Sequence, residues 1–332
     1  MFGGHSPLQE KQLDCKGVIL DVGQVKSTQA TLRVLVSLLA LSPLANALVI
    51  NGENAPDNYR FSSGYPLTPV PNNSSSFVAA GFDLSGVGWG TDAKRSYTMI
   101  SDRYFVFATH YPPTDNDMYF FSPTNGRVHY SIDSAFSLTL EYPFASPGNH
   151  LMTDLSVGRL TTAINAADNI TSYPILNLSP ANYVGLNLLV YGWDAAVGTG
   201  VIGELGQGNL YWDNNTPANA ADDILKTDTN FDNLNDTYVM TFTQGAGAGE
   251  ALLQGGDSGS PTFVPWNGSL ALVGTHSAVN GSTSYDTFLP AYMQSLDNQG
   301  IPFNTVPEPS SCFLIFAGLG GVAFARRKFG VR

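Results

Sequence analysis

Cysteine is nearly absent from this chain, which has only two among its 332 residues. Cys15 and Cys312 lie close to the two ends, outside the roughly 250 residues that we expect to form the folded body. The sequence therefore excludes a scaffold held together by disulfides. A chain of this size can bury a sufficient hydrophobic core without such cross-links.

Charge, and positive charge above all, is also scarce. Charged residues make up 13% of the chain, and residues 48–305 contain 7 basic and 23 acidic residues, a formal balance of −16. A surface with that balance repels phosphate backbones, so we expect no nucleic acid as a partner. The 34 glycines, 15 tyrosines and 19 phenylalanines favour a loop-rich all-β protein instead.

The N-terminal segment has the pattern of a secretory signal. Arg33 precedes an apolar run over residues 34–44, and Ala45-Asn46-Ala47 supplies the small residues of a cleavage site. A buried helix is the alternative, but the run is short. We therefore expect residues 1–47 to be an extended leader that is removed after Ala47 during export.

The C-terminal segment combines three features. Pro307-Glu308-Pro309 comes first, an apolar stretch from Cys312 to Ala325 follows, and Arg326-Arg327-Lys328 comes last. The stretch is shorter than the roughly 20 residues of a comfortable transmembrane helix. The positive charge after it should keep that end in the cytoplasm.

In this order, the three features resemble the bacterial PEP-CTERM sorting signal, which we assign to residues 306–332. The resemblance implies an exosortase-type processing enzyme as a partner and a membrane association through this segment before processing. It also implies delivery to the cell surface, the extracellular matrix or the periplasmic side of the membrane. A plain C-terminal transmembrane anchor is the alternative.

Between the two ends, short apolar or alternating runs are separated by clusters of Gly, Pro, Asn and Asp, which predicts a sandwich or barrel. Residues 213–236 are expected to form a long loop. Asp228, Asn230 and Asp232 are spaced like calcium ligands, but the glycine and glutamate of an EF-hand loop are missing. Calcium binding there stays open, and we predict no other metal and no cofactor.

A nucleophile is indicated by Gly255-Gly256-Asp257-Ser258-Gly259-Ser260-Pro261. Amide hydrolysis needs an exposed, activated hydroxyl and backbone N–H donors where the oxyanion forms. The glycines around Ser258 permit a tight turn that leaves such donors free. Taken alone, a motif of this kind is equally compatible with a nucleophile and with a simple turn.

Two further segments carry a candidate base and a candidate carboxylate. His110 follows the apolar run Tyr104–Ala108, and Asp154 precedes the apolar run Leu155–Leu160. Alone, His110 is compatible with a satisfied core histidine and Asp154 with a strand-end cap. Their order and spacing, with 44 residues from His110 to Asp154 and 104 from Asp154 to Ser258, allow the three residues to be interpreted together.

Together the three segments resemble the trypsin/chymotrypsin-like serine peptidases, in that family's order His, Asp, Ser. Further similar segments are Val190-Tyr191-Gly192-Trp193, Leu272–Ser277 and Pro290-Ala291-Tyr292. The resemblance implies two antiparallel β-barrels with the active site between them and a short C-terminal helix. We assign residues 48–165, with His110 and Asp154, to the first barrel and residues 166–305, with Ser258, to the second.

The resemblance also implies roles for individual residues. His110, Asp154 and Ser258 would form the catalytic triad, and the N–H groups of Gly256 and Ser258 would form the oxyanion hole. Ser277 would support Asp154 and pair with the substrate backbone.

Activation and specificity follow from the same resemblance. Val49-Ile50-Asn51-Gly52 is similar to the family's mature N-terminus, which pairs with the aspartate before the nucleophile, here Asp257. Removal of the leader, with or without trimming of Leu48, is therefore expected to activate the enzyme.

Leu252 occupies the base of the substrate pocket where tryptic members carry an aspartate, which argues against cleavage after Lys or Arg. His276 either selects an acidic residue before the scissile bond (P1) or packs neutral beneath an apolar pocket. The sequence thus predicts an exported serine endopeptidase that acts on polypeptides. The alternative is a non-catalytic surface or matrix protein on a peptidase-like scaffold.

Overall fold

The computed structural model describes residues 48–141, 152–179, 182–183, 186–194, 199–205, 225–227, 237–244 and 246–308. The chain divides into two units, residues 1–43 and 44–332, and every described residue belongs to the second. The expected leader, the calcium-like pattern at 228–232 and the apolar tail lie outside the described residues.

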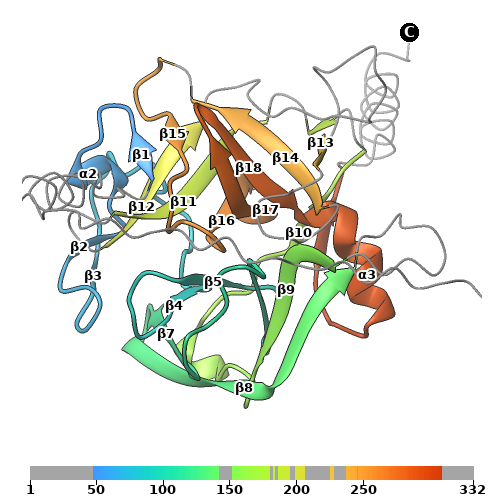
Figure 1. Ribbon diagram of the computed structural model, residues 1–332. Coiled ribbons are helices and arrows are strands. Elements are labelled where there is room, and N and C mark those ends of the chain that lie inside the picture. Colours follow the sequence, from blue (N-terminus) through green and yellow to red (C-terminus); the bar gives the residue numbers. More distant parts are fainter. Residues whose placement is uncertain are drawn as a thin grey trace, which may run out of the picture. The chain divides into compact units, whose positions relative to one another are not determined.

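Six antiparallel strands in the N-terminal half close into a barrel (Figure 1), in the order β4-β5-β6-β9-β8-β7. A closed barrel leaves no free strand edge. Alternation along the strands fills its interior, as on β7, where Met118, Phe120 and Ser122 are buried and the intervening residues are half-buried. The strands are β4 (Val87–Trp89), β5 (Ser96–Met99), β6 (Tyr104–Phe107), β7 (Asp117–Ser122), β8 (Gly126–Glu141) and β9 (Met152–Leu160).

Gly158 on β9 allows the close packing inside this barrel. A Cβ atom at Gly158 would lie 2.1 Å from Cζ of Phe105, which is itself fully buried on β6. Because β6 and β9 pair directly, the same contact fixes the two strands that lead to His110 and Asp154.

The C-terminal half is built on a nine-stranded sheet with the path β12-β11-β16-β17-β18-β14-β13. β10 pairs in parallel with β17, and β19 pairs in parallel with β10. The strands are β10 (Ile175–Asn177), β11 (Leu188–Asp194), β12 (Thr199–Leu205), β13 (Leu225–Thr227), β14 (Thr237–Thr243), β16 (Pro261–Trp266), β17 (Ser269–Asn280), β18 (Thr283–Phe288) and β19 (Thr305–Pro307).

The predicted all-β class is confirmed, with a closed barrel in the first half, a second β half and a short C-terminal helix. The second half differs from the expected closed barrel. Among the described residues its sheet path starts at β12 and ends at β13, and no ladder joins these two strands.

Short elements complete the fold. Two small antiparallel pairs join β1 to β15 and β2 to β3. Asn54 caps the N-terminus of α2 by accepting from the N–H of Asp57. These elements and the single-turn helix after the first barrel are β1 (Val49–Ile50), α2 (Ala55–Asn58), β2 (Phe61–Ser63), β3 (Val70–Pro71), η1 (Ala166–Asp168) and β15 (Ala251–Leu252).

The chain after β18 forms η3 (Leu289–Tyr292) and α3 (Met293–Asn298). Leu289, Tyr292 and Leu296 recur at helical spacing and are fully buried, which explains why this amphipathic segment packs onto the body. Gly300 ends it with a φ of +66°. No helix within the described residues is long and apolar enough to span a membrane, and the apolar tail, for which a transmembrane anchor was the alternative, lies outside them.

One hydrophobic cluster continues across both halves. It includes Val106 and Val157 from the first barrel and Tyr191, Phe263 and Leu272 from the second sheet. This shared core brings the loop after β6, the start of β9 and the loop between β15 and β16 to one place, and these carry the candidate site.

Candidate active site

Ser258 lies in the loop that joins β15 to β16. Gly256 has a φ of +115° and Gly259 a φ of +85°, values that favour glycine. A Cβ atom at Gly259 would also lie 3.3 Å from the backbone of Ala108 and Ser96 in the first barrel. The loop that carries Ser258 therefore rests directly against the half that carries His110.

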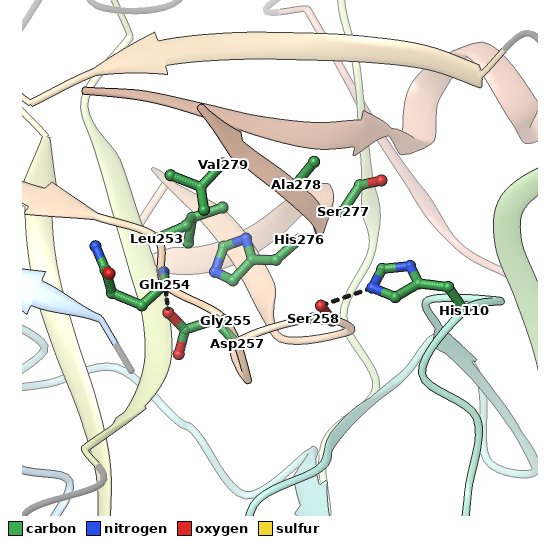
Figure 2. A pocket seen from close by; sticks show the side chains of 10 residues that line it. All are labelled: His110, Leu253, Gln254, Gly255, Asp257, Ser258, His276, Ser277, Ala278 and Val279. Atoms are coloured by element: carbon green, nitrogen blue, oxygen red, sulfur yellow. Dashed lines mark hydrogen bonds between the residues drawn. The ribbon is translucent and has the colours of Figure 1, made fainter. Parts of the chain in front are cut away.

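His110 and Asp154 are brought together by the pairing of β6 with β9, which places Phe107 opposite Ser156. The imidazole Nδ1 lies 2.9 and 2.8 Å from the two carboxylate oxygens of Asp154. The backbone N–H of His110 also donates to Oδ1 of Asp154 at 3.1 Å. On the other side of the ring, Nε2 lies 2.8 Å from Oγ of Ser258 (Figure 2).

Asp154 is 1% exposed, and it is held from a second direction. Ser277 Oγ donates to Oδ2 of Asp154 at 2.5 Å. Ser277 can turn this way because β17 has a register shift between His276 and Ala278 in its pairing with β18. A bulge of this kind redirects the side chain at the extra residue.

The N–H groups of Gly256 and Ser258 are available as donors. Within the described part of the chain neither donates to a protein acceptor, whereas the neighbouring N–H groups of Asp257, Gly259 and Ser260 all do. Two adjacent free donors beside Ser258 Oγ can stabilise negative charge that develops on a carbonyl oxygen.

A cavity of about 250 Å³ opens next to Ser258 (Figure 2). Leu253, Ala278 and Val279 give it an apolar wall, and Ser258 lies between this part of the cavity and His110. The full lining consists of His110, Leu253, Gln254, Gly255, Asp257, Ser258, His276, Ser277, Ala278 and Val279.

His276 borders the cavity but has its ring nitrogens directed into the protein. Nδ1 lies 2.6 Å from Oδ1 of Asp286 and Nε2 lies 2.6 Å from the Tyr191 carbonyl oxygen. Burial lowers the pKa of His276, but Asp286, with Asp257 and the Tyr191 carbonyl, outweighs it and leaves the pKa raised. The expectation that His276 hydrogen-bonds an acidic substrate is corrected, because both of its ring nitrogens already have partners inside the protein.

Asp257 is 1% exposed and accepts three backbone N–H groups. Its Oδ2 accepts from Leu48 at 2.7 Å and from Gln254 at 2.8 Å, and its Oδ1 accepts from Trp193 at 3.0 Å. Burial raises its pKa to about 6, although His276 and these hydrogen bonds act in the opposite direction. Gly192 makes the approach possible, because a Cβ atom there would lie 2.6 Å from Cβ of Leu48 and 2.7 Å from Oδ1 of Asp257.

Two predicted positions are shifted by one residue. Leu48, and not Val49, places its backbone nitrogen beside Asp257. Leu252 pairs with Val49 in the β1–β15 ladder and does not line the cavity, whereas the next residue, Leu253, does. Both shifts occur at the ends of the two-residue strands β1 and β15, whose pairing sets which residue reaches the site.

Asp286 was missed altogether by sequence reasoning. It lies on β18 opposite His276, is fully buried, and also accepts from Thr262 Oγ1 at 2.5 Å. An isolated acidic residue in an otherwise uncharged strand segment was the available signal, because a buried carboxylate requires a partner.

Solved structures similar to this chain include two of heparin binding protein and one of neuropsin. A mutant of human heparin binding protein (CAP37) is 13% identical with a TM-score of 0.45, and the match covers 65% of this chain and 91% of that one. An atomic-resolution structure of heparin binding protein gives 15%, 0.45, 68% and 95% for the same quantities. Neuropsin, a serine protease expressed in the limbic system of mouse brain, gives 16%, 0.42, 64% and 92%.

No curated protein matches the chain in sequence. One family model does match, over residues 305–328, and its description is "PEP-CTERM protein-sorting motif". The predicted C-terminal sorting signal is thereby confirmed, and the chain carries the signal of proteins that are exported and sorted towards the cell surface.

Proposed function

We propose that this protein is an exported serine endopeptidase that cleaves polypeptides through His110, Asp154 and Ser258. The observation that carries the proposal is the continuous contact from Ser258 Oγ to His110 Nε2 at 2.8 Å and from His110 Nδ1 to Asp154 at 2.8 Å. An acceptor at Nδ1 keeps the proton on that nitrogen and leaves Nε2 able to receive the proton of the serine.

The reaction proceeds through an acyl-enzyme. Ser258 Oγ forms a bond to the scissile carbonyl carbon as its proton passes to His110 Nε2. The C–N bond then breaks, and His110 gives the proton to the leaving amine. Water repeats the sequence: it transfers a proton to His110, releases the acid, and Ser258 Oγ regains its proton. Asp154 stabilises the imidazolium that forms twice in each cycle.

The oxyanion of both tetrahedral intermediates is bound by the N–H groups of Gly256 and Ser258. Their freedom from protein acceptors supports this role. Removing one such donor from an oxyanion hole typically lowers the rate by about 10²–10³-fold.

The P1 side chain enters the cavity beside Ser258, and we propose that it is a small or medium apolar side chain. Leu253, Ala278 and Val279 offer it apolar contacts. His276 directs both ring nitrogens at Asp286 and the Tyr191 carbonyl, so neither is left to bond a substrate carboxylate. A basic side chain would find no exposed acidic partner in this wall, consistent with non-tryptic specificity.

Leader removal after Ala47 creates the active N-terminus without further trimming. The new α-amino group of Leu48 replaces its amide at Asp257, 2.7 Å from Oδ2. Before its own tail is processed, the protein associates with the membrane through that tail, and an exosortase-type enzyme is the processing partner. Its place of action is the cell surface, the matrix or the periplasmic side of the membrane.

The test is fluorophosphonate labelling and peptide-library cleavage with protein secreted from a host that removes the leader. Wild type, Ser258→Ala and the exposed control Ser282→Ala are compared, with the N-terminus of each verified. We expect labelling and cleavage in wild type and Ser282→Ala, and neither in Ser258→Ala. A folded wild type that starts at Leu48 and neither labels nor cleaves overturns the proposal in favour of a non-catalytic scaffold. Cleavage after acidic residues overturns the proposed P1 class alone.

A further inference from the structure

The sorting motif begins inside the folded domain. The matched segment starts at Thr305, and residues 305–307 form β19, which lies parallel to β10. The register joins Ile175 to Thr305 and Leu176 to Val306, and the Ile175 N–H donates to the Asn304 carbonyl at 2.8 Å. Val306 also packs, half-buried, against the core of the second half. The first residues of the signal are therefore an edge strand of the sheet.

The middle residue of the Pro-Glu-Pro tripeptide is held as well. Glu308 Oε1 accepts from the backbone N–H of Ser179, from the Ser179 hydroxyl, and from Asn182 Nδ2 at 3.0 Å. Asn182 Nδ2 also donates to Ser179 Oγ at 3.0 Å, which orients both donors. Hydrogen bonds from Ser179 and Asn182 lower the pKa of Glu308, so its carboxylate is the bound form.

These contacts use the backbone edge and the carboxylate that a processing enzyme would bind. Enzymes that bind extended peptides use a backbone edge for affinity and side chains for specificity. In the tripeptide, the edge of β19 that faces β10 is already paired, and the carboxylate of Glu308 is already satisfied. A processing enzyme cannot bind that edge and that carboxylate while both stay docked.

We propose that the folded domain keeps Pro307 and Glu308 of the sorting motif in a closed state, and that the exosortase-type enzyme acts only on molecules in which β19 and Glu308 have left β10 and Ser179. The fraction of open molecules then sets the apparent affinity of the enzyme for its substrate. Ser179 and Asn182 control that fraction although neither belongs to the sorting motif. The proposal rests on the motif and its contacts, and it is independent of peptidase activity.

The docking is weak enough to be reversible. β19 has three residues, and Glu308 and its donors lie at the surface. Solvent-exposed charge-assisted contacts contribute little each, so removing two of the three donors should raise the open fraction by about three- to tenfold. The N–H of Ser179 remains in every variant.

The experiment uses the full chain and leaves residues 305–328 untouched. Ser179→Ala/Asn182→Ala is compared with wild type and with Asn187→Ala, an exposed asparagine nearby that makes no bond to Glu308. Hydrogen exchange of residues 303–308, followed by mass spectrometry on purified protein in detergent, reports the opening. Conversion to the processed form, followed over time in a bacterium with an exosortase-type enzyme, reports how fast the enzyme processes the open molecules.

We expect exchange at residues 303–308 and the rate of processing to rise together, by about three- to tenfold, in the double variant. Asn187→Ala should match wild type in both, and all three proteins should melt at the same temperature. Unchanged exchange in the double variant overturns the proposal. Faster exchange with unchanged or slower processing overturns it too, because the closed state would then not limit the enzyme.

Discussion

His276 and Asp286 face each other across β17 and β18, with Nδ1 2.6 Å from Oδ1 and both side chains fully buried. The pair lies next to the cavity at Ser258, yet it is formed within the protein. Asp286 also accepts from Thr262 at 2.5 Å, so it joins β16, β17 and β18. A buried charge is tolerated only while its partner is present.

Asp286→Asn removes the negative charge and leaves the shape almost unchanged. We expect the free energy of unfolding in urea at pH 6 to fall by about 3–5 kcal/mol, because the imidazolium is left buried without a counter-charge. The pKa of His276, now raised, should fall in the variant. The exposed control Asp297→Asn should change stability by less than about 0.5 kcal/mol. An Asp286→Asn protein as stable as wild type would show that the pair is not ionised.

The pKa of His276 also predicts how stability varies with pH. Since the pKa of His276 is raised in the folded state, its contribution to stability is complete below the ordinary histidine pKa of 6.5 and is lost as pH rises through the folded-state pKa. The free energy of unfolding of wild type should therefore fall as pH rises from 6.5 through the folded-state pKa of His276. In the double variant His276→Gln/Asp286→Asn it should fall less. The check is urea unfolding at half-unit steps between pH 6 and 9, and parallel curves for the two proteins would contradict it.

We predict that peptidase activity depends on the position of the N-terminus to within one residue. Chains that start at Ala47, Leu48 and Val49 are compared, each with the N-terminus confirmed by mass spectrometry. Only the chain that starts at Leu48 can place an ammonium group 2.7 Å from Asp257. We expect its kcat/KM to exceed that of the other two by at least about tenfold, since a buried carboxylate that lacks its charged partner destabilises the surrounding conformation by about 3–5 kcal/mol, and about 1.4 kcal/mol is tenfold in rate. Highest activity for the chain that starts at Val49 would contradict this register.

Stability of the same chains should depend on pH in a way that Asp257 dictates. Where Leu48 provides only an amide, burial raises the pKa of Asp257 from its ordinary value of 3.8 to about 6. The protonated form is then favoured by folding, so this contribution is present below 3.8 and is lost as pH rises through 6. An ammonium partner lowers that pKa. At pH 7 we expect the chain starting at Leu48 to be more stable than the chain starting at Ala47 by about 1–3 kcal/mol, with the gap closing towards pH 4.

The cavity wall predicts how P1 preference can be altered. Val279→Ala enlarges the pocket and should shift cleavage in a peptide library towards bulkier apolar P1 residues, by about tenfold in relative kcat/KM. Val264→Ala, a buried valine outside the cavity, is the matched control and should affect stability but not preference. An unchanged preference in Val279→Ala would mean that P1 does not enter this cavity.

Arg60 is a further determinant of stability. It is 4% exposed and donates to the carbonyls of Leu84 and Val87 and to the Tyr191 hydroxyl. Arg60→Met removes a buried donor from all three acceptors, although the Leu84 carbonyl keeps the Val87 N–H, and we expect a loss of about 2–4 kcal/mol in urea unfolding. Arg103→Met, at a half-buried arginine, serves as the control with a smaller loss. Arg103 donates to the carbonyls of Leu160 and Thr161 nearer the surface, so equal losses would mean that the burial of the Arg60 acceptors does not set the cost.

The sequence allowed the all-β class and the candidate triad to be predicted, because both depend on local patterns. The glycines around Ser258 and the apolar runs beside His110 and Asp154 are such patterns. Registers could not be predicted. The turn at Gly281 alone would place Asp286 opposite Ser277, but the bulge on β17 moves it opposite His276.

Other features depend on pairings that no local pattern specifies. Which residue reaches Asp257 depends on how β1 pairs with β15, a ladder of two residues separated by about 200 positions in the chain. The three-residue pairing of β19 with β10 is equally short, and neither strand has an alternating pattern that would reveal a partner. Such contacts form only once the surrounding core has brought the segments together.

The contact between Leu48 and Asp257 links the protein's location to its chemistry. A chain that continues before Leu48 presents an amide to Asp257. Under the proposed leader removal, the ammonium group arises only during translocation. Under the proposed function, the cell needs no inhibitor for newly made copies, because crossing the membrane is itself the step that makes the peptidase active.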